Sequence, residues 1–332
     1  MISVIIPTYK RSDYIERAIN SVLHQTYQDF EIIVVDDNNP GTDERTELEK
    51  KMRKFEKNPK IHYIQHDKNR NGAVARNTGI KNAKGDYIAF LDDDDFYIQD
   101  RLETLYKVLE QNKQYDAAYS DTVIINAKGE IVEIVEAKEY GDISKKMLLK
   151  ETTIGTGSNL FFRAKALKDI GGFNEELKRH QDIEIVVRFC QKYKILNINK
   201  LLVVKDNGNR INKLKSVDEL LETKEKYMKE FEKYVQKYPE NEKNKFYFVH
   251  YLEILYLIMS NGEINKISVI KEKINKYGKI NLKIKIKLLR YGIYKFLRID
   301  LMKEKFKNKI IRKNISQDII NEIDKNTHRR SI

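Results

Sequence analysis

Short runs of β-branched and aromatic residues alternate with helical patterns near the start of the chain, and this alternation limits the fold more than any other feature. The runs cover residues 2–6, 31–35, 61–64 and 87–91. Residues 15–23, 48–55 and 73–83 place apolar side chains at helical spacing between the runs, and Ser12 and Asp13 are available as a helix cap. This β-α-β-α-β-α-β order predicts an α/β fold: an open, mostly parallel sheet with helices on both faces.

The charge of the chain is unevenly divided. Residues 1–204 carry 32 Lys and Arg against 33 Asp and Glu, whereas the rest carries 31 against 17, so the net charge of +13 arises from the last two fifths. From about residue 209, glycine and proline also become rare. We therefore expect an α/β domain over residues 1–208, followed by a basic α-helical region over residues 209–332.

Composition excludes several classes of protein. Hydrophobic residues make up 41% of the chain, so it can bury a core and is not intrinsically disordered. The single cysteine, Cys190, excludes a disulfide framework and a cysteine-ligated zinc. The first residues do not resemble a signal peptide, and no apolar stretch reaches the roughly 20 residues of a spanning helix. A cytoplasmic location is the expectation.

Polar residues follow the first two runs, at the sheet edge where open α/β sheets bind ligands. Residues 7–11 include Tyr9, which can stack on a flat ring, and Arg11, which can meet a phosphate. An ordinary strand-to-helix turn is the alternative. Asp36 and Asp37 follow the second run, where carboxylates hold a ribose or a base, or cap a helix.

Four consecutive carboxylates, residues 92–95, follow the fourth run. They repel one another unless a cation relieves them, and their hard oxygens suit Mg²⁺ or Mn²⁺ shared with phosphate. A solvated acidic loop is the alternative. Upstream, Arg70 and Arg76 flank a predicted helix start, which would form an anion site or a solvated helix face. Neither a phosphate-binding P-loop nor a dinucleotide fingerprint is present.

Taken together, these segments resemble the family 2 glycosyltransferases with a GT-A fold. The resemblance covers about residues 1–205 and rests on five segments in order: VIIPTY at residue 4, SVLHQTY at residue 21, VVDD at residue 34, ARNTG at residue 75 and FLDDDD at residue 90. It implies nucleotide-sugar binding by about residues 1–100, usually of a UDP-sugar, and an acceptor side formed by about residues 101–208.

The resemblance also implies a role for individual residues. Asp182, in a Gln-Asp segment, would be the catalytic base, although a carboxylate there could instead stabilise a helix start. Asp94 would hold Mn²⁺ or Mg²⁺, with a register uncertain by one position in the aspartate run. The residues expected to bind the nucleotide sugar are Pro7, Thr8, Tyr9, Arg11, Asp37, Arg70, Arg76, Asp92 and Asp93.

The implied reaction is a single displacement that inverts the anomeric configuration. Asp182 would take the proton of the acceptor hydroxyl, and the metal would stabilise the leaving nucleoside diphosphate. The implied acceptor is a bacterial surface glycan, such as capsule or cell-wall polysaccharide, or a lipid-linked oligosaccharide. Many relatives carry a histidine soon after the last strand. Residues 205–210 have none, so Asp206 or Asn209 would substitute, or the metal would be held more loosely.

The basic C-terminal region lies outside the resemblance. Residues 280–313 could form a cationic amphipathic helix on an anionic membrane, at the inner face of the plasma membrane, or they could pack on the catalytic domain or on a second subunit of a homo-oligomer.

Two other functions stay open. A sugar-nucleotide pyrophosphorylase would need a glycine-rich N-terminal loop, which residues 7–11 do not form. A non-enzymatic nucleic-acid binder would explain the basic tail but not the aspartate run, so no nucleic acid is expected as a partner.

Overall fold

The computed structural model describes residues 1–209, 217–261, 266–282, 284 and 315–328. The chain divides into two compact units. The first contains Met1–Ser144, Thr152–Asn209 and the described residues 315–328, and the second contains Lys145–Glu151 and the described residues between 217 and 284. The division therefore falls close to the predicted boundary at residue 208, but two segments lie on the other side of it.

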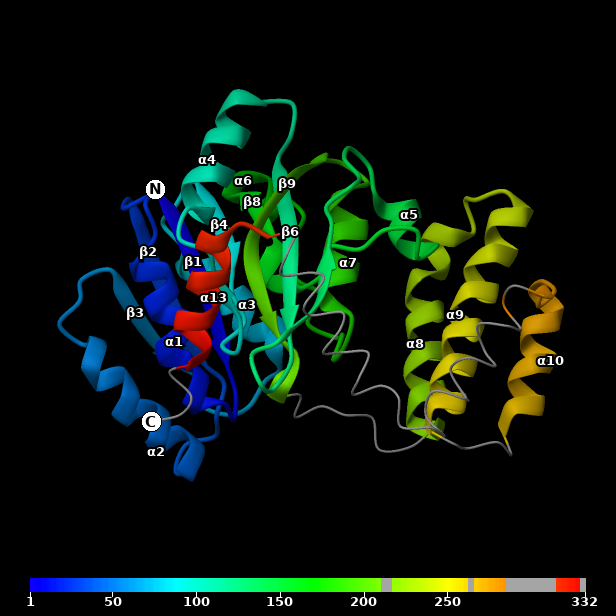
Figure 1. Cartoon of the computed structure of the whole chain (residues 1–332), viewed down its shortest axis with the longest axis horizontal. Coiled ribbons are helices and arrows are strands. Elements are labelled where there is room, and N and C mark those ends of the chain that lie inside the picture. Colours follow the sequence, from blue (N-terminus) through cyan, green and yellow to red (C-terminus); the bar gives the residue numbers. More distant parts are fainter. Residues whose placement is uncertain (210–216, 262–265, 283, 285–314, 329–332) are drawn as a thin grey trace. The chain divides into compact units, whose positions relative to one another are not determined.

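The first unit is built on one mixed sheet. In the described residues its order is β3-β2-β1-β4-β8-β6-β9-β5, with β7 paired to β6 (Figure 1). The strands are β1 (Ile2–Thr8), β2 (Phe30–Asp36), β3 (Ile61–Gln65), β4 (Tyr87–Phe90), β5 (Phe96–Tyr97), β6 (Ala117–Ile125), β7 (Ile131–Val135), β8 (Phe161–Arg163) and β9 (Ile195–Asp206).

The four predicted runs are the parallel half of this sheet. β1 pairs in parallel with β2 and β4, and β2 pairs in parallel with β3. The other half is mixed, because β8 pairs antiparallel with both β4 and β6 whereas β6 and β9 are parallel. The predicted α/β fold is thus confirmed, and the parallel arrangement is concentrated where the sequence pattern was strongest.

Helices cover both faces of the sheet, as expected. Side chains of α1, α2 and α4 pack with Ile2, Val4 and Ile6 on one face, and α3 packs against Ile5 on the other. The helices of the first unit are α1 (Ser12–Leu23), α2 (Asp43–Met52), α3 (Gly72–Asn82), α4 (Arg101–Gln111), α6 (Ala164–Asp169), α7 (Gln181–Phe189) and α13 (Gln317–His328), with 3₁₀ turns η1 (Arg53–Phe55), η2 (Gly157–Asn159) and η3 (Asn207–Asn209). Ser12 and Asp13 do not cap α1: the cap position is Arg11, and no side chain bonds there, because the helix starts one residue earlier than the pattern suggested.

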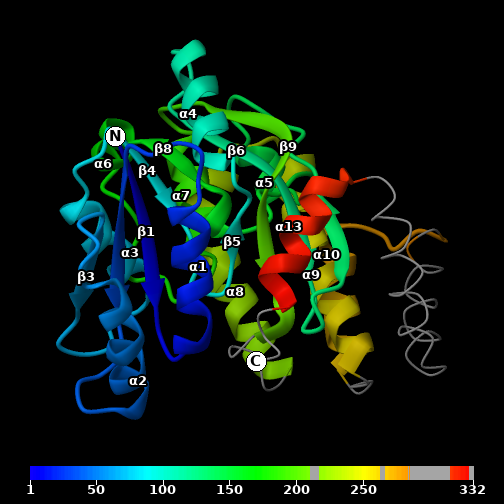
Figure 2. The same cartoon turned by 60° about the vertical axis from the view of Figure 1, so that its left-hand side comes forward.

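Helix α13 belongs to the first unit although it lies near the C-terminus of the chain. Ile320 and Ile323 pack in one apolar cluster with Phe96, Val123 and Val204, so the helix lies against strands β5, β6 and β9 (Figure 2). The predicted boundary placed this segment with the basic helical region. Composition did not distinguish α13 from the helices of the C-terminal region, because its amphipathic pattern resembles theirs.

The second unit is helical, as predicted for the C-terminal region. Its helices are α8 (Val217–Val235), α9 (Glu240–Asn261) and α10 (Ile267–Tyr277), and it includes most of α5 (Ser144–Leu148). Phe231, Phe246 and Ile254 are buried in it. Glu253 accepts contacts from Lys150 at 2.5 Å and from Lys224 at 2.6 Å. The first ion pair attaches residues 145–151 to α9, and the second joins α8 to α9.

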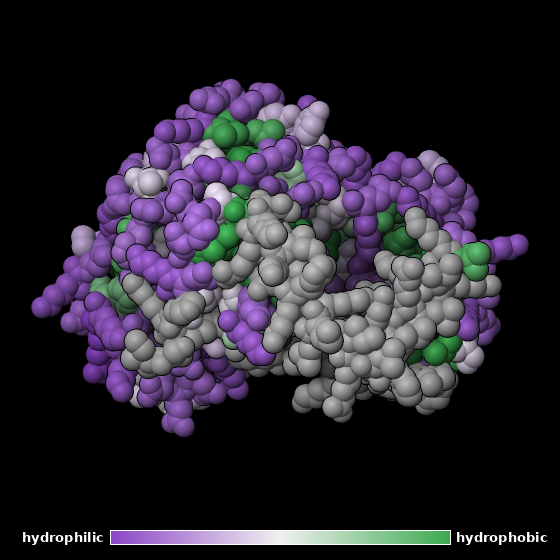
Figure 3. Space-filling view, in the orientation of Figure 1, coloured by the Kyte–Doolittle hydropathy of each residue, from purple (hydrophilic) through white to green (hydrophobic). Residues whose placement is uncertain are grey.

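The surface formed by the described residues is mainly hydrophilic on the face shown in Figure 3, in line with a charged fraction of 34%. None of the described helices combines the length and the apolar character that crossing a membrane requires. Residues 285–314, which hold most of the predicted membrane-binding helix, lie outside the described residues.

Candidate active site

The carboxyl ends of β1 and β4 lie side by side because these strands are parallel neighbours. This arrangement brings residues 7–11 next to the aspartate run. Pro7 and Thr8 are the last residues of β1 rather than part of a loop, and the Thr8 side chain is buried. Tyr9 is 38% exposed beyond the strand, so its ring is available to a ligand. The first polar motif thus meets the aspartates, as the resemblance implies.

Arginines, rather than solvent, neutralise the aspartate run. Arg11 pairs with the carboxylate of Asp94 and lies 3.4 Å from that of Asp93. Arg76, from α3, donates to Asp92 at 2.5 Å. Burial is the largest cause that raises the pKa of Asp93 to about 7, against the opposing effect of Arg11. The predicted repulsion contributes as well, because the neighbouring carboxylates of Asp94 and Asp92 also raise this pKa. The run is therefore a buried, partly neutralised cluster and not a solvated loop.

The last aspartate of the run is structural. Asp95 is buried and accepts hydrogen bonds from the Ser158 hydroxyl at 2.6 Å, the Thr156 hydroxyl at 3.1 Å and the backbone N–H of Asp206 at 3.0 Å. The Ser158 hydroxyl in turn accepts from the backbone N–H of Asp92 at 2.9 Å. Asp95 and Ser158 thereby fix the backbone of the run against the turn before β8.

Arg101 supports the same turn from within the core, and sequence reasoning missed it. Its guanidinium is fully buried, donates to Ser120 Oγ at 2.9 Å, to Asn159 Oδ1 at 3.3 Å and to the Ser158 carbonyl at 3.3 Å, and lies 4.6 Å from the ring centre of Tyr97. Burial lowers the pKa of Arg101. From the sequence alone, an arginine at the start of a helix is expected to be exposed to solvent, so no local signal could have identified this role.

Asp206, one of the two candidates to replace the missing histidine, is the last residue of β9. Its carboxylate is buried and pairs with Arg17 at 2.9 Å. Arg17 also donates to the backbone carbonyl of Asp94, so the pair ties the end of β9 to the aspartate run. The neighbouring Lys205 is half-buried and lines the pocket described below. The side chain of Asn209 lies outside the described residues.

Asp37 organises a loop at the end of β2. Its carboxylate accepts from Asn69 Nδ2 at 2.8 Å and from the backbone N–H groups of Arg70 at 2.8 Å and Asn71 at 3.0 Å, and His66 Nδ1 lies at 2.7 Å. Asn71 then caps α3 by accepting from the N–H of Ala73. The backbone of Arg70 is thus fixed while its side chain is exposed.

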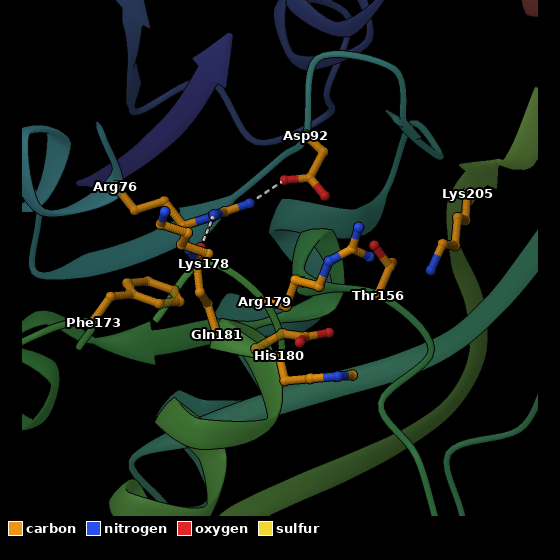
Figure 4. A pocket seen from close by; sticks show the side chains of 11 residues that line it. Arg76, Asp92, Thr156, Phe173, Lys178, Arg179, His180, Gln181 and Lys205 are labelled. Atoms are coloured by element: carbon orange, nitrogen blue, oxygen red, sulfur yellow. Dashed lines mark hydrogen bonds and ion pairs between the residues drawn. The ribbon is translucent and has the colours of Figure 1, made fainter. Parts of the chain in front are cut away.

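A pocket joins the aspartate run to the predicted base. Asp92 and Asp182 both line it, ninety positions apart in the sequence, together with Arg76 and Phe173 (Figure 4). The described residues that line the pocket are Arg76, Asp92, Thr156, Gly157, Phe173, Lys178, Arg179, His180, Gln181, Asp182 and Lys205. Gln181 accepts from Arg76 at 2.9 Å, which links α7 to α3 across the pocket. Three of the predicted site residues are therefore brought together, from three different elements.

Asp182 lies in the first turn of α7, and the residue before this helix is strained. His180 has a φ of 60° in the left-handed region, which residues other than glycine rarely adopt. Such strain persists where the surrounding structure imposes it, commonly at functional sites. Here it turns the chain so that Asp182 lines the pocket.

The remaining predicted residues do not line the pocket. Arg11, Asp93 and Asp94 lie beside it at the ends of β1 and β4, whereas Asp37 and Arg70 belong to the loop at the end of β2. The sequence reasoning also missed four pocket residues. Lys178 and Arg179 lie just before His180 and the Gln-Asp segment, Lys205 is the penultimate residue of β9, and Thr156 precedes η2, so only the first two had a local signal.

The aspartate run fits a divalent cation that is shared with a ligand. Asp93 Oδ2 is buried with no hydrogen-bond partner among the described residues, and Asp94 offers a second carboxylate beside it. The described residues contain no group of three or more His, Cys, Asp or Glu side chains placed to hold a metal by themselves. Hard oxygen donors in pairs suit Mg²⁺ or Mn²⁺ when phosphate and water complete the shell.

Comparison with known proteins gives a consistent result. The model of the family described as "Glycosyl transferase family 2" matches residues 3–171. An uncharacterised glycosyltransferase of Rickettsia felis is 43% identical over 136 residues, which cover 41% of this chain and 21% of that protein, so the chain spans about a fifth of that relative's length. The putative teichuronic acid biosynthesis glycosyltransferase TuaG of Bacillus subtilis is 38% identical over 122 residues, covering 37% of this chain and 46% of TuaG.

Among solved structures, residues 1–349 of S. aureus TarS in complex with UDP-GlcNAc are similar to this chain. The TM-score is 0.54 at 19% sequence identity, and the match covers 83% of this chain and 88% of that one. At this identity the similarity establishes the fold alone.

Proposed function

Because the chain belongs to glycosyl transferase family 2 and has the GT-A fold, we propose that it moves a sugar from a UDP-sugar to a hydroxyl of a bacterial surface glycan or of a lipid-linked oligosaccharide, with inversion at the anomeric carbon. The observation that carries the proposal is the pocket itself. It places Asp92, at the end of β4, in one cavity with Asp182, at the start of α7, and with Arg76 between them (Figure 4).

The nucleotide would lie along the carboxyl ends of β1 and β2. Tyr9 offers an exposed ring, and Arg70 an exposed guanidinium, while Pro7 and Thr8 form the strand end between them. Asp37 would reach the base by exchanging one of its present partners, such as the side chain of Asn69. A UDP donor is supported by the similar TarS structure, whose complex contains UDP-GlcNAc.

The diphosphate would lie between Arg76 and Lys205, which line the pocket next to Asp92. A guanidinium and an ammonium group placed there can stabilise charge that develops on the leaving group. A Mg²⁺ or Mn²⁺ ion held by Asp93 and Asp94 would supply further stabilisation of that charge when bound. Arg11, which now pairs with these carboxylates, would then be released to a phosphate oxygen.

Asp182 would act as the general base. Its carboxylate lines the pocket at the start of α7, where it can accept the proton of an acceptor hydroxyl as that oxygen attacks the sugar. A single displacement of this kind inverts the anomeric configuration. The acceptor class is supported by the similarity to TuaG, a putative glycosyltransferase of teichuronic acid biosynthesis.

Attachment to an anionic membrane through residues 280–313, at the inner face of the plasma membrane, stays a proposal, as does self-association. Family membership removes the grounds for the pyrophosphorylase and for the nucleic-acid binder, because neither is a member of this family.

The test combines donor binding with turnover. Thermal unfolding with UDP, GDP, dTDP and CMP and their sugars, each with and without Mn²⁺, identifies the nucleotide, since a ligand that binds the folded state raises its melting temperature. Asp182→Asn should then lower kcat by about 10²–10⁴-fold while donor affinity is retained. Asp67→Asn, an exposed carboxylate outside the pocket, serves as the matched control. Full turnover by Asp182→Asn would remove it as the base.

A further inference from the structure

Two cationic side chains line the pocket on the side of the proposed base. Lys178 and Arg179 directly precede the strained residue His180, and with Arg76 and Lys205 they make four cations against the carboxylates of Asp92 and Asp182. Both residues belong to the segment that precedes α7; in Figure 4 Lys178 is drawn beside Arg76, and the Arg179 side chain extends toward Thr156. The lining is therefore positive overall, and two of its four cations lie shortly before the proposed base in the sequence.

The loop that carries these two cations is held firmly in place. Asn71 Nδ2 donates to the carbonyl of Glu175 at 2.9 Å, and Asn77 Nδ2 donates to the carbonyl of Phe173 at 2.8 Å and to Glu175 Oε1 at 2.9 Å. At its other end, Gln181 Nε2 donates to the Leu177 carbonyl at 2.7 Å. The acidic side chain of Glu175 is thus directed to α3, and it does not line the pocket. The backbone on either side of the two cations is thus held in place.

Other cationic side chains are placed to bind the diphosphate of the donor. Arg76 pairs with Asp92 on the strand side of the pocket, Lys205 comes from the end of β9, where its Nζ donates to the Gly155 carbonyl at 3.0 Å, and Arg11 lies at Asp93 and Asp94. These three side chains surround the position proposed for the diphosphate. Lys178 and Arg179 are attached instead to the element that presents Asp182, where the acceptor hydroxyl must lie.

We propose that the acceptor carries a negatively charged group, a phosphate or a carboxylate, close to the hydroxyl that receives the sugar, and that Lys178 and Arg179 bind this group. This inference rests on the proposed function. Arginine binds either anion through two parallel hydrogen bonds, and lysine adds a point charge, so the pair would fix the hydroxyl at the carboxylate of Asp182.

The test measures acceptor binding by titration calorimetry on the full chain, in the presence of the nucleotide found in the thermal panel. Three probes are compared: an oligogalacturonate, the same oligomer with its carboxyl groups reduced to alcohols, and a glycerol phosphate oligomer. The variants are Lys178→Gln with Arg179→Gln, the charge-preserving Lys178→Arg, and a control that removes two exposed lysines outside the pocket, Lys57→Gln with Lys81→Gln. Donor affinity and melting temperature are measured for each.

We expect at least one anionic oligomer to bind about tenfold or more tightly than the reduced oligomer, and this preference to fall at about 0.5 M salt. Lys178→Gln with Arg179→Gln should abolish the preference, whereas Lys178→Arg and the control pair should keep it. The preferred oligomer shows whether the group is a carboxylate or a phosphate. Equal binding of the charged and the reduced oligomers, or a preference that survives in the double variant, would overturn the inference. Failure of every nucleotide to bind would instead refute the proposed function.

Discussion

The close approach of α3 to the central strand predicts a specific response to Gly79→Ala. A Cβ atom at Gly79 would lie 2.4 Å from Ile5 Cγ2, 3.0 Å from Cγ1 and 3.1 Å from Cδ1. Ordinary carbon contacts are about 3.5–4.0 Å. Ile5 is fully buried in β1, which has β2 on one side and β4 on the other, so the strand cannot yield and the helix must move.

Two opposing effects set the magnitude. Replacing glycine by alanine inside a helix favours folding by about 1 kcal/mol. Overpacking a close-packed core costs about 1–3 kcal/mol, and a 2.4 Å contact with a fixed strand belongs at the upper end of that range. The expected net effect is a loss of about 2 kcal/mol in the free energy of unfolding. Moving α3 also moves Arg76 away from Asp92, so donor affinity should fall as well.

Chemical denaturation of a double-mutant cycle measures the effect. Gly79→Ala should destabilise the wild-type chain, but in an Ile5→Ala background, where the clashing atoms are gone, it should stabilise by about 1 kcal/mol. Lys81→Ala, at an exposed position of the same helix, is the control and should change stability by less than about 0.5 kcal/mol. A Gly79→Ala variant that is as stable as the wild type would refute the packing argument.

Two further predictions concern the aspartate run and α13. Ser158→Ala should lower stability by about 2–3 kcal/mol and weaken donor binding, because it removes the shortest of the hydrogen bonds to buried Asp95 and the side-chain acceptor of the Asp92 N–H; denaturation and nucleotide titration check this, and a change below about 0.5 kcal/mol would contradict it. Burial, together with the charge of Asp100, raises the pKa of Glu322 in α13 to about 7, although a hydrogen bond from the Gln99 backbone acts in the opposite direction. The folded protein therefore favours the protonated form of Glu322 and loses stability as the pH rises from about 4.5 to about 7. The melting temperature of Glu322→Gln should therefore exceed that of the wild type at pH 8 and equal it below about pH 4.5. A difference in melting temperature that does not depend on pH would contradict the raised pKa of Glu322.

The parallel half of the sheet could be predicted from sequence because its signals are local. Each of β1 to β4 is a short run of β-branched or aromatic residues that ends at polar residues, and the helices between them show apolar spacing. The polar motifs follow these strands directly, so their placement at one edge required only the rule that parallel strands point the same way.

The pairing of side chains required the tertiary structure. Asp92, Asp93, Asp94 and Asp95 are identical in sequence, yet the fold presents Asp92 to the pocket and buries Asp95 against Ser158. Which carboxylate meets which arginine depends on side chains brought together from distant positions, such as Arg11 and Asp94. A local pattern holds no information about such contacts.

The sequence by itself determined the alternation of strands and helices, the edge where ligands bind and the chemical type of the groups there, because each depends on neighbours along the chain. Only the tertiary structure decided that Lys178 and Arg179 share a pocket with Asp92, that Arg101 is buried, and that α13 returns to the first unit. Those outcomes depend on which surfaces exclude water together, and burial of that kind is a property of the packed chain rather than of any segment.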